Sequence, residues 1–186
     1  MTSRFWQTSR IPRVALILLA AGFLVYRAVP DLTSNFGRGS VGHEIPALAL
    51  KTIDGAPVTR ETLRGRVVLV NFWASWCGPC VTEMPAFQRI FLEKNAAGFT
   101  VLGVWTNDTD AFAMRDLLRT SHITYPIVVA TDDVVRDFGG VWGIPTSVLV
   151  DRTGRIHRRI TGMFAEDALR AAVDSLLAEP PTTAQR

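Results

Sequence analysis

The sequence predicts an α/β fold in which a mixed β-sheet lies between helices. Along residues 46–178, short apolar runs typical of buried strands alternate with amphipathic helical patterns. The composition is 48% hydrophobic and 20% charged, as in globular proteins, which excludes wholesale disorder. The length of 186 residues suits one ordinary domain with additional segments. Two cysteines are too few for the disulfide framework of a small secreted module.

The first 29 residues predict a membrane signal-anchor. Three arginines precede an unbroken apolar run at residues 14–26, and no acidic residue occurs before Asp31. A helix over residues 11–29 would be about 28 Å long, just enough to cross a bilayer core. We expect the segment to stay as a transmembrane anchor, and a cleaved secretory signal is the alternative. The basic flank places the N-terminus in the cytoplasm and the remaining chain on the exported, periplasmic side.

Three further segments follow the predicted anchor. Residues 30–45 are rich in turn-forming residues and are interpreted as a linker. Residues 46–178 form the predicted folded domain, and residues 179–186 form a flexible tail.

The charge is distributed unevenly along the chain. Residues 1–39 carry five Arg and one Asp, whereas residues 40–186 carry fifteen Lys or Arg and sixteen Asp or Glu. The basic character therefore belongs to the N-terminal segment, and the body of the chain is nearly neutral. This distribution argues against a nucleic-acid partner.

The predicted strands are short apolar, β-branched runs bounded by turn residues. Asp54-Gly55 indicates a hairpin ahead of the sheet, and Arg152-Thr-Gly154 indicates a second hairpin near its end. The run at residues 67–73 is typical of a central strand buried on both faces. The expected strands are 47–51, 57–59, 67–73, 100–106, 127–130, 146–151 and 155–161.

The predicted helices begin at residues that favour helix starts. Pro79 suits a first helical turn, Pro85 should bend the same helix, and Asp108 can cap the next one. Gly139-Gly140 is followed by no phosphate-loop pattern and is interpreted as a turn. The expected helices are 79–95, 108–120, 132–138 and 165–178.

Both cysteines lie in Trp76-Cys77-Gly78-Pro79-Cys80, between a central strand and the start of a helix. A helix N-terminus offers unpaired amides and a positive dipole end, which stabilise a thiolate at Cys77. The three-residue spacing brings the two sulfurs together within the first turn. We expect Cys77 to attack the disulfide of a partner and Cys80 to resolve the mixed disulfide.

Other uses of two cysteines fit this pattern less well. A structural disulfide would close a very short loop and add little stability, and a peroxidatic thiol needs no such pair. A zinc site usually needs four ligands, and His43, His122 and His157 show no paired spacing. Haem attachment requires His after the second cysteine, where this chain has Val81. We therefore expect neither a cofactor nor a metal.

The segment Phe72-Trp-Ala-Ser-Trp-Cys-Gly-Pro-Cys80 resembles the thioredoxin active site. Further motifs narrow the resemblance to the membrane-anchored thiol–disulfide oxidoreductases related to TlpA, ResA and CcmG, the last also called DsbE. These motifs are Leu63-Arg-Gly-Arg-Val-Val-Leu-Val-Asn71, Glu83-Met84-Pro85 and Gly143-Ile-Pro-Thr-Ser-Val-Leu-Val-Asp151. The resemblance spans about residues 41–178. It implies a thioredoxin-like fold with an N-terminal β-hairpin and a central insert near residues 107–131.

The resemblance also implies a substrate-binding surface. Pro145, preceded by Ile144, would be the cis-proline that faces the disulfide, beside a backbone edge able to pair with an extended peptide. An ordinary trans proline that opens a strand is the alternative. Trp73 and Trp76 are expected to pack around the site and shield it rather than perform chemistry. Trp76 is also expected to contact the substrate, together with Ile144 and Pro145.

Glu83 would be the acid near the buried thiol. A desolvated carboxylate there could relay a proton to or from Cys80. The alternative is an acid in the first helical turn that only complements the helix dipole. Thioredoxin carries Asp where this chain has Asn71, and an amide cannot serve as the base, which favours Glu83.

The expected function is that of an exported, membrane-tethered reductase. A transmembrane thiol reductant would supply electrons, and the substrates would be exported proteins that carry disulfides, such as apocytochrome c or a copper-site assembly factor. A dithiol oxidase or isomerase is the alternative within the same chemistry, because redox direction depends on potential and partner. A non-catalytic scaffold or a thiol-dependent metal carrier is the alternative from a different class.

Overall fold

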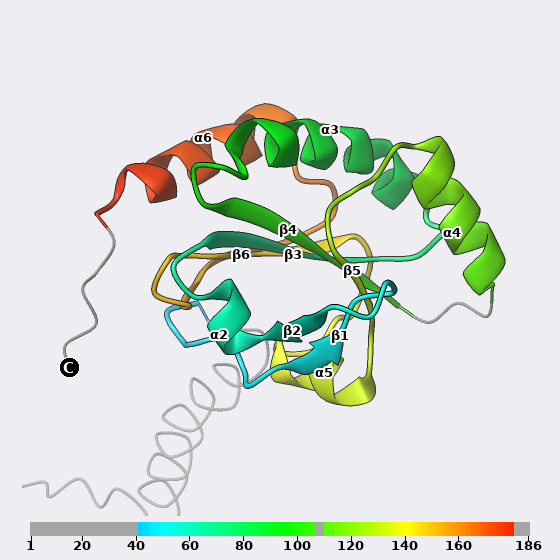
Figure 1. Ribbon diagram of the computed structural model, residues 1–186, viewed down its shortest axis with the longest axis horizontal. Helices are drawn as coiled ribbons and strands as arrows, with labels where there is room; N and C mark the ends of the chain where they lie inside the picture. Colours follow the sequence, from blue (N-terminus) through cyan, green and yellow to red (C-terminus); the bar gives the residue numbers. More distant parts are fainter. Residues whose placement is uncertain (1–40, 107–109, 181–186) are drawn as a thin grey trace, which may run out of the picture. The chain divides into compact units, whose positions relative to one another are not determined.

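The computed structural model describes residues 41–106 and 110–180, whose sheet is covered by helices on both faces (Figure 1). The predicted anchor at residues 1–29, most of the predicted linker and the last six residues lie outside this range. Within the described part of the chain, no helix is long and apolar enough to cross a membrane. The membrane anchor therefore stays a prediction.

The main sheet has five strands in the order β5-β4-β3-β6-β7. The central strand β3 (Val67–Trp73) pairs in parallel with β4 (Phe99–Trp105) and antiparallel with β6 (Thr146–Val150). On the outside, β5 (Ile127–Val129) runs parallel to β4, and β7 (Ile156–Thr161) runs antiparallel to β6. The predicted mixed α/β fold is confirmed.

The register brings several loops to one end of the sheet, which we call the β3 carboxyl end. Phe72 lies opposite Val104 on one side and opposite Thr146 on the other. Thr146 in turn lies opposite Thr161 of β7. The chain therefore leaves β3, β4 and β7, and enters β6, at this same end.

The hairpin predicted around Asp54-Gly55 is confirmed. It consists of β1 (Ala49–Lys51) and β2 (Pro57–Thr59), which pair antiparallel, and Gly55 adopts a φ of 90° that favours glycine. A single-turn helix that we did not expect, α2 (Arg60–Leu63), follows directly. A reciprocal capping box between Thr59 and Thr62 stabilises it, and four residues are too few for a helical period to be recognised.

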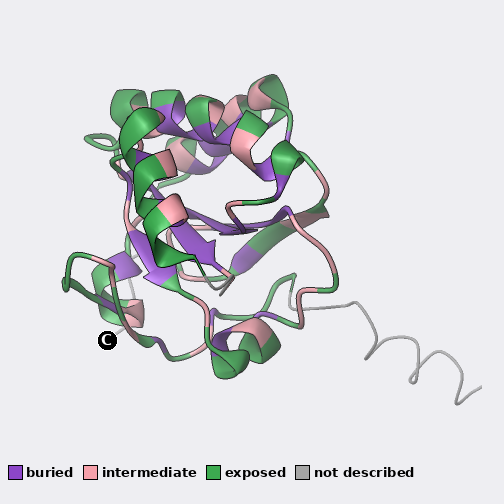
Figure 2. Ribbon diagram, turned by 90° about the vertical axis from the view of Figure 1, so that its right-hand side faces the viewer, coloured by how far each residue is buried: buried purple, intermediate pink, exposed green. Residues whose placement is uncertain are grey.

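The alternating side chains of β3 divide the interior into two apolar cores. Leu69 and Trp73 belong to the core under α3 (Gly78–Lys94) and α6 (Glu166–Ala178), whereas Phe72 belongs to the core on the opposite face. Every residue of β3 is buried. In Figure 2 the strands are mostly buried, whereas the helices are exposed along their outer sides.

Helix α6 packs beside α3 through apolar contacts and ion pairs. Leu169, Val173 and Leu176 of α6 are buried in the core that they share with α3. Lys94 pairs with Asp174 at 2.5 Å, and Arg170 pairs with Glu93. This packing positions the segment just before α6. That segment reaches the functional site described below.

Two shorter helices complete the domain. Helix α4 (Ala111–Thr120) begins later than predicted, because Asp110 is its cap and accepts the Ala113 N–H at 2.8 Å. The assignment of the cap to Asp108 was wrong, and Asp108 itself lies outside the described residues. Helix α5 (Asp132–Asp137) lies on the opposite face of the sheet from α4 (Figure 1).

The last residues of the predicted linker already contact the folded domain. Val41 and Glu44 form isolated bridges with Ile156 and Arg155, and Ile45 is buried. The domain therefore begins a few residues before the predicted position 46.

Candidate active site

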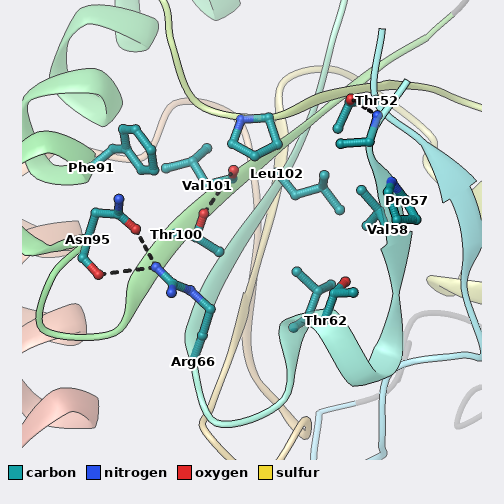
Figure 3. A pocket seen from close by; sticks show the side chains of 13 residues that line it. Thr52, Pro57, Val58, Thr62, Arg66, Phe91, Asn95, Thr100, Val101 and Leu102 are labelled. Atoms are coloured by element: carbon teal, nitrogen blue, oxygen red, sulfur yellow. Dashed lines mark hydrogen bonds between the residues drawn. The ribbon is translucent and has the colours of Figure 1, made fainter. Parts of the chain in front are cut away.

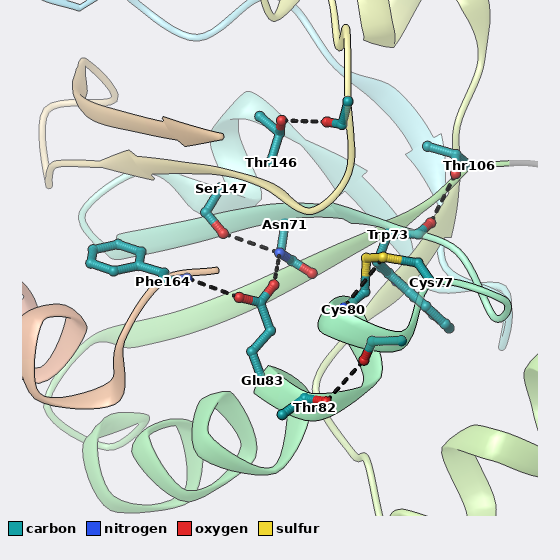
Figure 4. The surroundings of a disulfide bond; sticks show 12 residues. Asn71, Trp73, Cys77, Cys80, Thr82, Glu83, Thr106, Thr146, Ser147 and Phe164 are labelled. Carbon is teal, nitrogen blue, oxygen red and sulfur yellow. Dashed lines mark hydrogen bonds between the residues drawn. A yellow bond between two sulfur atoms is a disulfide. The ribbon is translucent and has the colours of Figure 1, made fainter. Parts of the chain in front are cut away.

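The cysteine pair occupies the start of α3, directly after the β3 carboxyl end (Figure 4). Cys77 and Cys80 form a disulfide with an S–S distance of 1.99 Å and a Cα–Cα distance of 5.3 Å. Cys77 caps the helix, and its sulfur accepts the Cys80 N–H at 3.3 Å. Pro79 lies in the first turn, where its missing N–H leaves no hydrogen bond unmade.

The two cysteines differ in how far they are buried. Cys77 keeps 5% of its surface exposed, whereas Cys80 is fully buried. A helix N-terminus stabilises negative charge on a sulfur, and the Cys80 N–H is one of the amides aimed at Cys77. The arrangement therefore favours Cys77 as the sulfur that a partner reaches.

Glu83 lies in the second turn of α3 and is only 3% exposed. No acidic residue occurs in the first turn of this helix. The alternative in which Glu83 acts as a first-turn acid for the helix dipole is therefore wrong. Cys80 and Glu83 are three residues apart, so they lie on the same buried face of α3.

Two hydrogen bonds hold the Glu83 carboxyl group, and a third connects its partner Asn71 to a neighbouring strand (Figure 4). The Asn71 amide donates to Glu83 Oε1 at 3.0 Å, and the Phe164 N–H donates to Oε2 at 3.0 Å. The same amide nitrogen of Asn71 donates to Ser147 Oγ at 3.0 Å. The carboxyl group from α3 is thus held by β3 and by the segment before α6.

The environment of Glu83 changes its acidity. Burial raises the pKa of Glu83 from 4.5 to about 7, although the hydrogen bonds from Phe164 and Asn71 act in the opposite direction. A pKa near neutrality lets a carboxyl group both accept and donate a proton at physiological pH. Glu83 therefore has the acidity that a proton relay needs.

The peptide bond between Ile144 and Pro145 is cis, so the alternative of a trans proline is wrong. Pro145 is buried, and its carbonyl accepts the Gly162 N–H at 2.8 Å. Ile144 is partly exposed and packs against both apolar cores, one of which contains Cys77. These residues lie directly before β6, at the end of the sheet where β3 leads to the cysteines.

The tryptophans around the motif take different roles. Trp73 is completely buried in β3, whereas Trp76 is 71% exposed next to Cys77. Trp142, which the sequence did not single out, is 85% exposed three residues before Pro145. Trp73 therefore shields the site by packing in the interior. Trp76, in contrast, is free to contact a partner molecule.

Sequence reasoning missed the partners of Glu83. Asn71 was noted only as a departure from thioredoxin, although a polar residue inside the apolar run 67–73 is itself a signal of a buried hydrogen bond. Ser147 is a second polar residue of this kind in a buried strand. Phe164 contributes only its main-chain N–H, which no residue type reveals.

A groove of about 330 Å³ lies elsewhere, between the β1–β2 hairpin and the start of β4 (Figure 3). None of the predicted site residues lines it. Its arginine, Arg66, donates to the main-chain oxygens of Asn95 and Phe99 at 3.1 and 2.7 Å.

Among the described residues, no group of three or more His, Cys, Asp or Glu side chains could hold a metal ion.

A mixed sheet with a Cys-x-x-Cys pair at the first turn of the following helix defines the thioredoxin-like thiol–disulfide oxidoreductases. The family model described as Redoxin matches residues 40–177, and the chain belongs to this family. The predicted class of enzyme, a thiol–disulfide oxidoreductase, is confirmed.

Curated relatives and solved structures agree with this assignment. The thiol-disulfide oxidoreductase ResA of Geobacillus thermodenitrificans is 27% identical, over 91% of this chain and 97% of its own. ResA of Bacillus subtilis is 26% identical over 84% of this chain and 86% of its own. A thiol:disulfide interchange protein of the thioredoxin family from Chlorobium tepidum matches with a TM-score of 0.68 and 30% identity, over 75% of this chain and 97% of its own.

Proposed function

We propose that this chain is a membrane-tethered reductase that transfers electrons from its Cys77–Cys80 dithiol to disulfides of exported proteins. The observation that carries the proposal is the order of burial at the start of α3. Cys77 is the cysteine with exposed surface, while Cys80 and Glu83 lie buried on the same helix. The exposed surface of Cys77 suits this sulfur for contact with a substrate. The buried Cys80 is suited to release the substrate from the mixed disulfide.

In the first step, the Cys77 thiolate attacks one sulfur of the target disulfide. The target S–S bond breaks, a mixed disulfide with Cys77 forms, and the second target sulfur leaves as a thiolate that takes a proton from water. In the second step, Cys80 loses its proton and attacks the Cys77 sulfur. The first target sulfur then leaves and is protonated, so two electrons and two protons reach the target.

Glu83 is the proposed acceptor of the Cys80 proton. A thiol buried in apolar surroundings resists ionisation, and Cys80 is fully buried. With a pKa of about 7, the Glu83 carboxyl is partly ionised at neutral pH and is able to take that proton. Its hydrogen bonds to Asn71 and Phe164 hold it in place without making it a strong acid.

The electron source and the targets follow from the family resemblance. A transmembrane thiol reductant would restore the dithiol, and apocytochrome c or a copper-site assembly factor would be the target. Trp76, Ile144 and Pro145 are the proposed substrate contacts. Their support is their position at the β3 carboxyl end, with Trp76 exposed and Ile144 partly exposed.

The membrane tether is proposed from residues 1–29 of the sequence. Basic residues precede the apolar run, which orients the N-terminus to the cytoplasm. Reporter fusions after Ser40 test this, because an exported-side reporter should be active and a cytoplasmic one silent. Cytoplasmic activity of the fusion would contradict the proposed location.

The reductase proposal is tested with the full-length chain in detergent or lipid nanodiscs. Reduced protein is mixed with a peptide disulfide, and the thiols released are counted against the variant that carries both Cys77→Ser and Cys80→Ser. Equilibration with glutathione buffers then gives the reduction potential. We expect a value nearer the about −270 mV of thioredoxin than the about −120 mV of a strong oxidant, and a value at the oxidising end would indicate an oxidase.

A further inference from the structure

A largely exposed tryptophan lies three residues before Pro145. Trp142 leaves 85% of its surface in water, and Trp76 leaves 71%. Large aromatic side chains dominate the binding energy of many protein interfaces. Neither the disulfide nor the Glu83 hydrogen bonds require Trp142.

Hydrogen bonds and two glycines anchor the loop that carries Trp142. Arg159 of β7 donates hydrogen bonds to the carbonyls of Phe138 and Gly140. The Gly140 N–H bonds the Val135 carbonyl at 2.9 Å, and Gly139 and Gly140 have φ values of 83° and 78°, which favour glycine. The loop therefore presents an apolar side chain to solvent from a fixed backbone.

Gly140 also leaves space for the indole ring. A Cβ atom at Gly140 would lie 3.2 Å from Trp142 Nε1 and 3.4 Å from Trp142 Cε2. The ring therefore lies against the backbone of this glycine, and a side chain there would displace it. A surface that is rigid before binding loses less conformational entropy when a partner arrives.

The strand register places Trp142 at the same end of the sheet as the cysteines. Phe72 of β3 lies opposite Thr146 of β6. Trp76 follows Phe72 by four residues, and Trp142 precedes Thr146 by four residues. Both tryptophans therefore belong to the β3 carboxyl end of the sheet.

A third exposed apolar side chain belongs to the same end. Met163 follows Thr161, the residue of β7 that lies opposite Thr146, and it is 53% exposed. Its neighbour Gly162 donates a hydrogen bond to the Pro145 carbonyl. Trp76, Trp142 and Met163 thus carry exposed uncharged surface at the end of the sheet that holds the cis-proline and the first cysteine.

We propose that Trp142 is a specificity-determining residue, which contacts a large apolar side chain adjacent to the cysteine of an extended target polypeptide. The occupant is a polypeptide, because a small disulfide bound at Cys77 carries no neighbouring side chain for Trp142 to contact. It is apolar at this position, because all three exposed side chains are uncharged and contact would remove their surface from water. The inference rests on the proposed reductase function.

The test compares two peptide disulfides and glutathione disulfide as substrates of the full-length reduced chain. The peptides are identical except for the residue after the reactive cysteine, which is Phe in one and Ser in the other. We expect the wild type to prefer the Phe peptide by about tenfold or more in kcat/KM, the range that one buried apolar group provides. Trp142→Ala should reduce that ratio to near one.

Two further variants define what the ratio means. Trp142→Phe keeps an aromatic ring and should retain most of the preference. Leu92→Ala removes another exposed apolar side chain, 66% exposed, which lies on α3 about 18 Å along the helix from Cys80 at ~1.5 Å per residue. This control variant should keep both the wild-type ratio and the wild-type rates.

The outcomes separate the two proposals. Failure of the wild type to reduce any of the three disulfides would overturn the reductase function. Reduction of both peptides with an undiminished preference in Trp142→Ala would overturn the role of Trp142 alone. An equal loss on all three substrates, glutathione disulfide included, would also overturn it, because the residue would then act on the cysteines rather than on recognition.

Discussion

The side-chain amide of Asn71 donates a 3.0 Å hydrogen bond to the carboxyl group of Glu83. Asn71 lies in the middle of β3, and its amide nitrogen also reaches Ser147 of β6. An amide carries no titrating proton, so within this group of hydrogen-bonded side chains Glu83 is the one that ionises. Asn71 acts here as a positioning residue for the carboxyl group.

Replacing Asn71 by Leu should raise the pKa of Glu83 above its value of about 7. The amide hydrogen bond lowers the pKa by stabilising the carboxylate, and leucine removes it at similar volume. NMR titration of the Glu83 side chain measures the shift. Ser147→Ala is the matched control, because it leaves the bond between Asn71 and Glu83 in place, and a shift as large in this control would contradict the interpretation.

The contribution of Glu83 to the stability of the oxidised protein should fall as the pH rises from 4.5 to 7. Folded and unfolded chains both hold the Glu83 proton below this window, and both have lost it well above. Within the window the folded chain binds more of the proton, so the free energy of unfolding falls, by about 3 kcal/mol in total. Denaturant melts across this pH range should show this decrease in the free energy of unfolding for the wild type. Glu83→Gln should lack the part of the decrease that comes from Glu83.

Glu83→Gln should slow the release of the mixed disulfide by ~10²–10⁴-fold, the usual contribution of a general acid–base group. The initial attack by Cys77 should keep its rate, because that thiolate is stabilised by the helix start. Stopped-flow reduction of a peptide disulfide resolves the two phases. A variant that releases its target at the wild-type rate would leave Glu83 with a structural role only.

Cys80→Ser should accumulate a mixed disulfide with a target, whereas Cys77→Ser should not. Cys77 has exposed surface and accepts an amide hydrogen bond at the helix start, while Cys80 is fully buried. Non-reducing gels of the two variants after incubation with a peptide disulfide distinguish them. Equal trapping by both would remove the assignment of attacking and resolving cysteines.

Gly103→Ala should destabilise the domain by about 1–3 kcal/mol through overpacking. A Cβ atom there would lie 2.5 Å from Ile127 Cδ1 and 3.2 Å from both Trp73 Nε1 and Tyr125 Cε2. Ile127→Val removes the nearest of these atoms. Denaturant melts of the double variant should therefore show less destabilisation than the sum of the two single variants, and strict additivity would contradict this account.

The sequence by itself determined the elements that depend on neighbouring residues. The limits of β3, the hairpin at Asp54-Gly55 and the start of α3 at the cysteines follow from apolar runs, turn residues and helix-start preferences. These signals act over a few residues, so the sequence shows them directly. The prediction placed the cap of α4 at Asp108 instead of Asp110, because two aspartates only two residues apart are equally suitable caps by sequence, and the folded chain uses the second.

Only the tertiary structure decided how Glu83 is held and what surrounds the cysteines. Its partners Asn71 and Phe164 are 12 and 81 residues away in the chain, and one of them offers only a main-chain N–H. The pKa of about 7 arises from burial between α3 and β3, which exists only once the helix has packed on the sheet. The exposure of Trp142 is likewise seen only in the folded chain, where Arg159 of β7 donates a hydrogen bond to Gly140 of the loop that carries it. Burial, exposure and hydrogen-bond partners are properties of segments brought together by folding, and no local pattern specifies them.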